Sequence, residues 1–290
     1  MTEARINTVQ CLSPTGLHRM AYKEWGDPGN PKVLVCVHGV TRVSDDFDRL
    51  AQALCDEYRV VCPDIVGRGR SSWLSDPRYY TVPQYVSDIV TLLARVDATH
   101  VHWFGTSMGG LIGMGLASLP DSPIEKMVLN DIGPALDPGA LARIGQYIGQ
   151  ERRFASFDEG MRYIREIAAP FGSHDEQEWV KLAADVLRQE SPNAWRLHYD
   201  PKLGGTFKSA TEDELKAAQS SLWAAYDAIR CPTLLVRGVQ SDLLAREVAE
   251  AMTKRGPRAQ LVEFPGVGHA PTFVHEDQIA VVRRFLLSKP

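Results

Sequence analysis

The 290-residue sequence lacks a large net charge, a long apolar run and any block of lysine and arginine. Its 32 basic and 36 acidic residues leave a net charge of −4, so we expect neither nucleic acid nor a membrane surface as a partner. No stretch approaches the roughly 20 apolar residues that cross a bilayer. The first seven residues are polar as a stretch, Met-Thr-Glu-Ala-Arg-Ile-Asn, and lack the apolar core of a signal peptide.

Cysteine is also scarce. The five cysteines form no C-x-x-C pair, and their odd number fits a reducing compartment, so we expect a cytoplasmic protein. His100 and His102 lie on one face of a predicted strand, but no third ligand accompanies them. We therefore predict no metal site.

Short apolar runs alternate with helical patterns over most of the chain. Continuous apolar runs indicate strands buried on both faces of a parallel sheet. Strands are predicted at residues 32–37, 58–62, 100–104, 125–130, 232–237 and 260–264. Helices are predicted at residues 45–55, 83–96, 109–119, 245–254 and 277–287, and residues 15–25 could add an edge hairpin. This alternation predicts an α/β fold with a doubly wound, mostly parallel sheet.

The alternation stops near Gly133 and resumes near Asp227. Between them, the pattern predicts helices at residues 139–151, 157–168, 175–190 and 211–222. We therefore divide the chain into a core, residues 1–133 and 227–290, and a helical cap, residues 134–226. An insertion of this kind lies above the carboxyl ends of the strands, where open α/β sheets bind their ligands.

Gly105-Thr106-Ser107-Met108-Gly109 stands between a predicted strand and a predicted helix. A serine between two glycines on such a turn is the nucleophile elbow of serine hydrolases. Side chains at positions 105 and 109 would collide with the neighbouring strand or helix, which explains the glycines. We predict that Ser107 is a nucleophile exposed above the sheet.

A serine hydroxyl needs a histidine as general base, and the histidine needs a carboxylate to fix its tautomer. His269, in a Gly/Pro-rich loop after the last predicted strand, is the preferred base. Asp242 and Asp131 each follow a predicted strand and could supply the carboxylate. We favour Asp242, and expect Asp131 to cap the start of the lid or to line the pocket.

An oxyanion hole needs two backbone N–H groups aimed at one point. We predict that Met108 supplies one and Val40, in the turn after the first buried strand, supplies the other. Arg42, Ile132 and Trp223 are further candidates for the pocket lining. Arg42 would either meet a substrate carboxylate or be an exposed arginine.

The segment 64–71, Asp-Ile-Val-Gly-Arg-Gly-Arg-Ser, is rich in glycine like a phosphate loop. It lacks the spacing and the lysine of a P-loop, so we interpret it as a turn after a strand.

The sequence resembles the α/β-hydrolase superfamily over nearly the whole chain. The matching segments are His38-Gly39, Asp64–Ser71, the Gly105–Gly109 elbow, the Gly238–Asp242 loop and Gly268-His269. The resemblance implies an eight-stranded sheet and a Ser-Asp-His triad. The stretches 38–42 and 129–134 resemble a bacterial subgroup of esterases and general hydrolases. Haloalkane dehalogenases and epoxide hydrolases of this fold carry aspartate at the position of Ser107, so neither activity is expected.

These features predict a serine hydrolase that cleaves a carboxylic ester through an acyl-enzyme and needs no cofactor. A lactonase, a C–C bond hydrolase, a perhydrolase or an amidase would use the same triad, and the sequence leaves them open. A non-catalytic small-molecule receptor is a further alternative. We expect a small ester or lactone as the binding partner, and the fold would also allow a homodimer.

Overall fold

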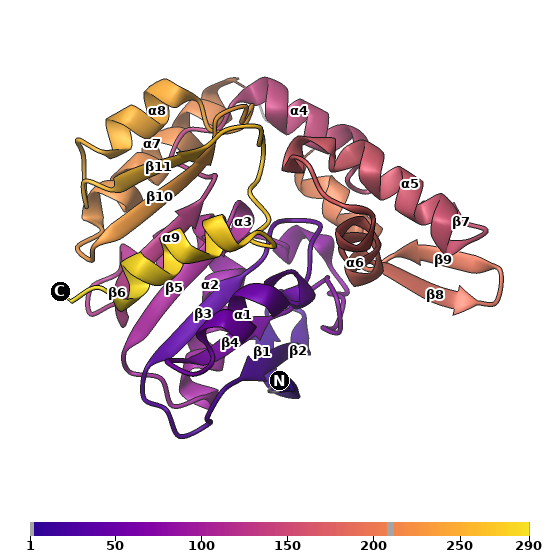
Figure 1. Cartoon of the computed structure of the whole chain (residues 1–290), viewed down its shortest axis with the longest axis horizontal. Coiled ribbons are helices and arrows are strands. Elements are labelled where there is room, and N and C mark those ends of the chain that lie inside the picture. Colours follow the sequence, from indigo (N-terminus) through magenta and orange to yellow (C-terminus); the bar gives the residue numbers. More distant parts are fainter. Residues whose placement is uncertain (1–2, 208–211, 290) are drawn as a thin grey trace.

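The computed structural model describes residues 3–207 and 212–289, and its centre is an eight-stranded sheet in the order β1-β2-β4-β3-β5-β6-β10-β11 (Figure 1). The β1–β2 hairpin at one edge is antiparallel, and β2 also runs antiparallel to β4. The remaining neighbours are parallel. The bounds are β1 Arg5–Ser13, β2 Gly16–Trp25, β3 Val33–Val37, β4 Arg59–Pro63, β5 Val101–Thr106, β6 Ile124–Asn130, β10 Thr233–Gly238 and β11 Gln260–Phe264. The predicted doubly wound sheet is confirmed.

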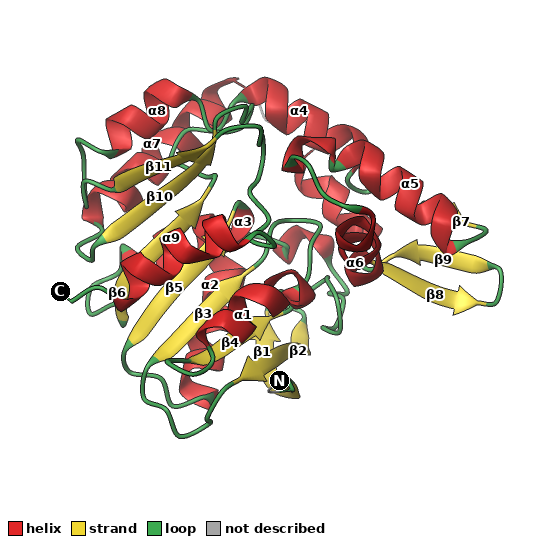
Figure 2. Cartoon of the chain, viewed as in Figure 1, coloured by secondary structure: helices red, strands yellow, loops and turns green. Residues whose placement is uncertain are grey.

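Helices cover both faces of the sheet (Figure 2). Residues of α1 (Asp48–Leu54) and α9 (Glu276–Leu287) pack into one apolar core. Residues of α2 (Val82–Arg95), α3 (Met108–Ala117) and α8 (Arg246–Met252) pack into the other. Successive side chains of β3 alternate between these two cores, and all five of its residues are buried. This two-sided burial is why the strand is apolar throughout.

A cap inserted after β6 lies beside the carboxyl ends of the parallel strands (Figure 1). It contains α4 (Pro138–Tyr147), α5 (Phe157–Ile167) and α6 (Glu176–Val186). It also contains a small antiparallel sheet in the order β7-β9-β8, with bounds Arg153–Phe154, Ala194–Leu197 and Leu187–Ser191. Short 3₁₀ helices lie at Ser44–Phe47, Pro77–Tyr79, Ala169–Phe171 and Pro201–Phe207.

Two details of the predicted cap differ from the structure. The helix predicted over residues 175–190 ends at Val186, and the chain continues as β8. The helix predicted to start at Thr211 is α7 (Glu212–Ala228); Thr211 itself lies outside the described residues. Because α7 packs against α3 of the core, we group it with the core helices, while the division of the chain at residues 134 and 226 stays a prediction.

None of the helices in the described ranges is long and apolar enough to cross a membrane. All five cysteines are free thiols, and four of them are buried.

Candidate active site

Ser107 occupies the sharp turn between β5 and α3, as predicted. Its φ of 50° lies in the left-handed region, where a non-glycine residue costs on the order of 1–3 kcal/mol. A Cβ at Gly109 would lie 2.0 Å from the carbonyl oxygen of Val37, and one at Gly105 would lie 2.4 Å from the backbone of Gly109. The two glycines therefore allow α3 to start close against β3 and hold the serine in this conformation.

A chain of hydrogen bonds joins Ser107, His269 and Asp131. The Ser107 hydroxyl lies 3.0 Å from Nε2 of His269, and Nδ1 of His269 lies 2.7 Å from Oδ2 of Asp131. In this arrangement Nδ1–H donates to the carboxylate, which leaves Nε2 free to accept the serine proton. The three residues follow β5, β11 and β6, whose carboxyl ends meet at one edge of the sheet.

Asp131 is held rigidly. Its side chain is fully buried, and its carboxylate accepts hydrogen bonds from the N–H of Gly238 at 3.0 Å and the hydroxyl of Ser241 at 2.6 Å. With His269, three donors satisfy this buried carboxylate. Ser241 was not among the predicted residues, because nothing in its surrounding sequence distinguishes it from other loop serines.

The preference for Asp242 over Asp131 as the partner of His269 was wrong. The carboxylate of Asp242 instead accepts two hydrogen bonds from Arg143 of α4, at 2.7 and 2.9 Å, and its side chain is 44% exposed. Gly238, the last residue of β10, and Ser241 in the loop after it both donate to Asp131, whereas Asp242 lies outwards and binds the cap. Asp131 also neither caps the lid nor lines the cavities described below.

Val40 and Met108 line the same cavity as Ser107. Met108 is the first residue of α3, so its N–H has no acceptor within the helix. The N–H of Val40 meets no acceptor among the described residues. Both groups are therefore available to a substrate oxygen, as the predicted oxyanion hole requires.

His38 fixes the turn that carries Val40. Its Nδ1 donates to the carbonyl of Gly39 at 2.7 Å, while its Nε2 accepts from the N–H of Ile65 at 3.0 Å. Burial lowers the pKa of this histidine to about 4, so the ring is neutral near pH 7 and can accept that bond. His38 thus ties the loop after β3 to the loop after β4.

Two cavities meet at Ser107. The first lies between the cap and the core, beside His269, and its walls from the cap are mainly apolar: Ile144, Tyr147, Ile164, Ile167, Phe171, Leu182, Val186, Leu197 and Tyr199. The second lies against α2 and α3 and is lined by Val82, Leu111, Ile132, Leu136, Leu141, Ile144 and Leu243, with Arg68, Tyr80 and Tyr85. An ester bound at Ser107 could therefore place its acyl and alcohol parts in separate cavities.

Of the three residues predicted to line the pocket, two border a cavity and one does not. Ile132 lines the second cavity, as expected. Arg42 lines the first, but its guanidinium already binds the carboxylate of Asp46 and the carbonyl of Leu182, so it is not free for a substrate carboxylate. Trp223 lines neither cavity, and its ring packs against Arg255 at 4.0 Å.

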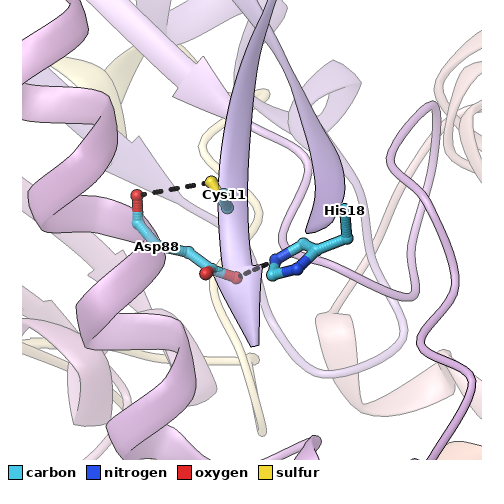
Figure 3. Close-up of side chains that lie close together, drawn as sticks. All are labelled: Cys11, His18 and Asp88. Carbon is cyan, nitrogen blue, oxygen red and sulfur yellow. Dashed lines mark hydrogen bonds and ion pairs between the residues drawn. The ribbon is translucent and has the colours of Figure 1, made fainter. Parts of the chain in front are cut away.

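Cys11, His18 and Asp88 form one group of potential metal ligands among the described residues (Figure 3). His18 Nε2 lies 2.9 Å from Asp88, whose second oxygen accepts from Gln84, and the Cys11 thiol approaches the Asp88 carbonyl. Burial raises the pKa of Cys11 to about 12, whereas a metal needs the thiolate. We assign these contacts to the packing of the β1–β2 hairpin on α2.

The fold agrees with comparisons with known proteins. A model of the alpha/beta hydrolase family matches residues 34–284, so the chain belongs to this family. A solved alpha/beta hydrolase from Novosphingobium aromaticivorans superposes with a TM-score of 0.85 at 33% identity, covering 99% of each chain. A Rickettsia typhi protein described as a hydrolase superposes with a TM-score of 0.90 at 28% identity, over 99% of this chain and 100% of that one.

Among curated proteins, the chain is similar to the 3-hydroxybutyrate-oligomer hydrolase of Cupriavidus necator. The two are 55% identical over 284 residues, which cover 97% of each chain. The predicted enzyme class, a hydrolase of the esterase type, is confirmed by the family and by this relative.

Proposed function

We propose that this enzyme hydrolyses ester bonds in short oligomers of 3-hydroxy acids, with Ser107 as nucleophile. The observation that carries the proposal is the hydrogen-bonded chain Ser107–His269–Asp131 at the meeting point of two cavities. The substrate class is supported by the similarity to the 3-hydroxybutyrate-oligomer hydrolase, which extends over nearly the full length of both chains.

In the first half of the reaction, Oγ of Ser107 attacks the ester carbonyl while Nε2 of His269 takes its proton. The carboxylate of Asp131 holds the ring in the Nδ1–H tautomer and stabilises the imidazolium. The N–H groups of Val40 and Met108 stabilise the oxyanion. The alcohol leaves with the proton from His269, and an acyl-enzyme remains.

In the second half, water takes the place of the alcohol. His269 accepts a proton from this water, and the resulting hydroxide attacks the carbonyl carbon of the acyl-serine. The same two N–H groups stabilise the second oxyanion, and Ser107 recovers its proton as the acid is released. None of these steps uses a metal or an organic cofactor.

The test compares wild type and Ser107→Ala on the dimer and trimer of 3-hydroxybutyrate and on p-nitrophenyl esters from acetate to decanoate. We expect turnover of the oligomers that falls on the order of 10⁴-fold or more in the variant. Lactones and β-diketones in the same panel represent the alternative activities that the triad would also support. Turnover of a lactone or diketone with inert oligomers would refute the proposed substrate class, and equal turnover by both proteins would refute the role of Ser107.

A further inference from the structure

Arg68 is a buried cation in the cavity that reaches the proposed nucleophile. It lies between Gly67 and Gly69 in the loop after β4, the segment whose pattern led us to expect only a turn. The residue is 1% exposed. Its side chain lines the second cavity, which also contacts Ser107 and Met108.

The guanidinium of Arg68 has incomplete partners. Its Nε donates to the carbonyl of Val40 at 2.9 Å, and Nη1 donates to the carbonyl of Val66 and the hydroxyl of Tyr85. Nη2 carries two hydrogens, yet its acceptor among the described residues is the thioether of Met108 at 3.3 Å. A thioether is a weak acceptor, so the end of the guanidinium nearest the oxyanion residue is poorly satisfied.

Arg68 also has no acidic partner among the described residues, unlike the other buried arginines. Three arginines in the described ranges are buried. Arg42 pairs with Asp46 and Arg237 pairs with Glu263, at 2.6 and 2.8 Å. Arg68 instead has the rings of Tyr80 and Tyr85 beside it, with its Cζ 5.9 and 5.1 Å from their centroids.

An unpaired charge in an apolar cavity is costly, and proteins normally compensate it with an opposite charge or strong acceptors. A substrate carboxylate would provide both, because arginine and carboxylate form short, strong hydrogen bonds. The cavity supplies the space, and its other walls are mainly apolar side chains that suit a short aliphatic chain.

We propose that Arg68 binds the free carboxylate of the substrate and so selects the terminal ester bond of a hydroxy-acid oligomer. This inference rests on the proposed function. In such an oligomer, the carboxylate belongs to the alcohol part of the last ester bond, only a few bonds from the scissile oxygen. With that end in the second cavity, each cleavage releases one hydroxy acid from the carboxyl end of the chain.

The test uses a matched pair of substrates, the 3-hydroxybutyrate dimer and its methyl ester, at pH 7. Release of 3-hydroxybutyrate or its methyl ester from the internal bond is followed by chromatography. Since one hydrogen-bonded charge is involved, we expect wild type to prefer the free acid about ten- to hundredfold in kcat/KM.

Arg68→Met is expected to bring this ratio near one, and Arg68→Lys to retain part of the preference. The ratio is the readout because Arg68 also binds the carbonyl of Val40, and damage to the oxyanion turn would slow both substrates alike. Arg143→Met is the matched control, since that arginine lines the first cavity and already pairs with Asp242. It should leave the ratio nearly unchanged.

A wild-type ratio near one would overturn the proposal without touching the proposed function, because both substrates would still be cleaved. The proposal would also be overturned if Arg68→Met kept the wild-type ratio, or if only Arg143→Met changed the ratio. If Arg68→Met fails to fold, the wild-type and Arg68→Lys ratios still decide. A wild-type enzyme that cleaves neither internal ester would instead refute the proposed function.

Discussion

Replacing Asp131 by asparagine tests the assignment of the triad carboxylate. The change keeps the shape of the side chain but removes its charge, which lies 2.7 Å from Nδ1 of His269 in a fully buried position. With charge centres roughly 4 Å apart and an effective dielectric constant of about 20, the imidazolium loses about 4 kcal/mol of stabilisation in the transition state. At 1.36 kcal/mol per factor of ten, that corresponds to about a 10³-fold loss of kcat.

The amide of an asparagine adds a second penalty, because it can donate to Nδ1 and favour the unreactive tautomer of His269. The combined loss should therefore lie between about 10³- and 10⁴-fold. The assay is hydrolysis of p-nitrophenyl butyrate at saturating substrate, with the melting temperature measured to confirm that the variant is folded.

Asp242→Asn is the matched control. Its side chain is 44% exposed and pairs with Arg143, which is itself one-third exposed, so the pair contributes about 0–1 kcal/mol. We expect kcat within about threefold of wild type. A loss of more than a hundredfold in Asp242→Asn, with Asp131→Asn close to wild type, would refute the reasoning.

Two further predictions concern stability. Gly109→Ala should lower the free energy of unfolding by at least about 3 kcal/mol, because its Cβ would lie 2.0 Å from the Val37 carbonyl oxygen. Gly115→Ala in the same helix is the control, since its Cβ would meet only the side chains of Val86 and Val82, at 3.2 and 3.8 Å. Equal stabilities of the two variants in urea would contradict this. The second concerns His38, whose pKa in the folded protein is about 4, below its ordinary value of 6.5. Between these two pH values the unfolded chain binds a proton that the folded protein does not. The free energy of unfolding therefore decreases as the pH falls from 6.5 to 4, by about 3 kcal/mol over the whole range. Unfolding in urea at several pH values across this range should show a weaker dependence of stability on pH for His38→Asn than for wild type. The same dependence in both proteins would be evidence against the lowered pKa of His38.

The central part of the sheet could be predicted because strands such as β3, β4 and β10 are buried on both faces. All six predicted runs coincide with strands, and β3 shows the reason, since its side chains alternate between two apolar cores. The cap strand β8, Leu187–Ser191, escaped prediction because four of its five residues are exposed and polar, and they continue the pattern of the preceding helix. It pairs with β9 in a local hairpin across the turn at Pro192 and Asn193, so its strand structure depends on that pairing and not on an apolar pattern of its own.

The candidate site was predicted only in part, because some of its residues have a signal in the local sequence and others do not. Ser107 and His269 have local signals, a glycine-flanked turn and a loop rich in glycine and proline. Asp131 and Asp242 follow β6 and β10, which are neighbours in the sheet, so chain order and strand position do not separate them. The choice depends on the course of the loop after β10, which directs Ser241 towards Asp131.

Covalent trapping of the nucleophile tests the central claim most directly. The enzyme would be incubated with diethyl p-nitrophenyl phosphate, which phosphorylates activated serines, and the labelled peptide would be identified by mass spectrometry. We predict that esterase activity is lost in proportion to labelling, with one adduct per enzyme on Ser107. Labelling of Asp131→Asn should be much slower. Full activity after prolonged exposure, or inactivation with the adduct on another residue, would contradict the account.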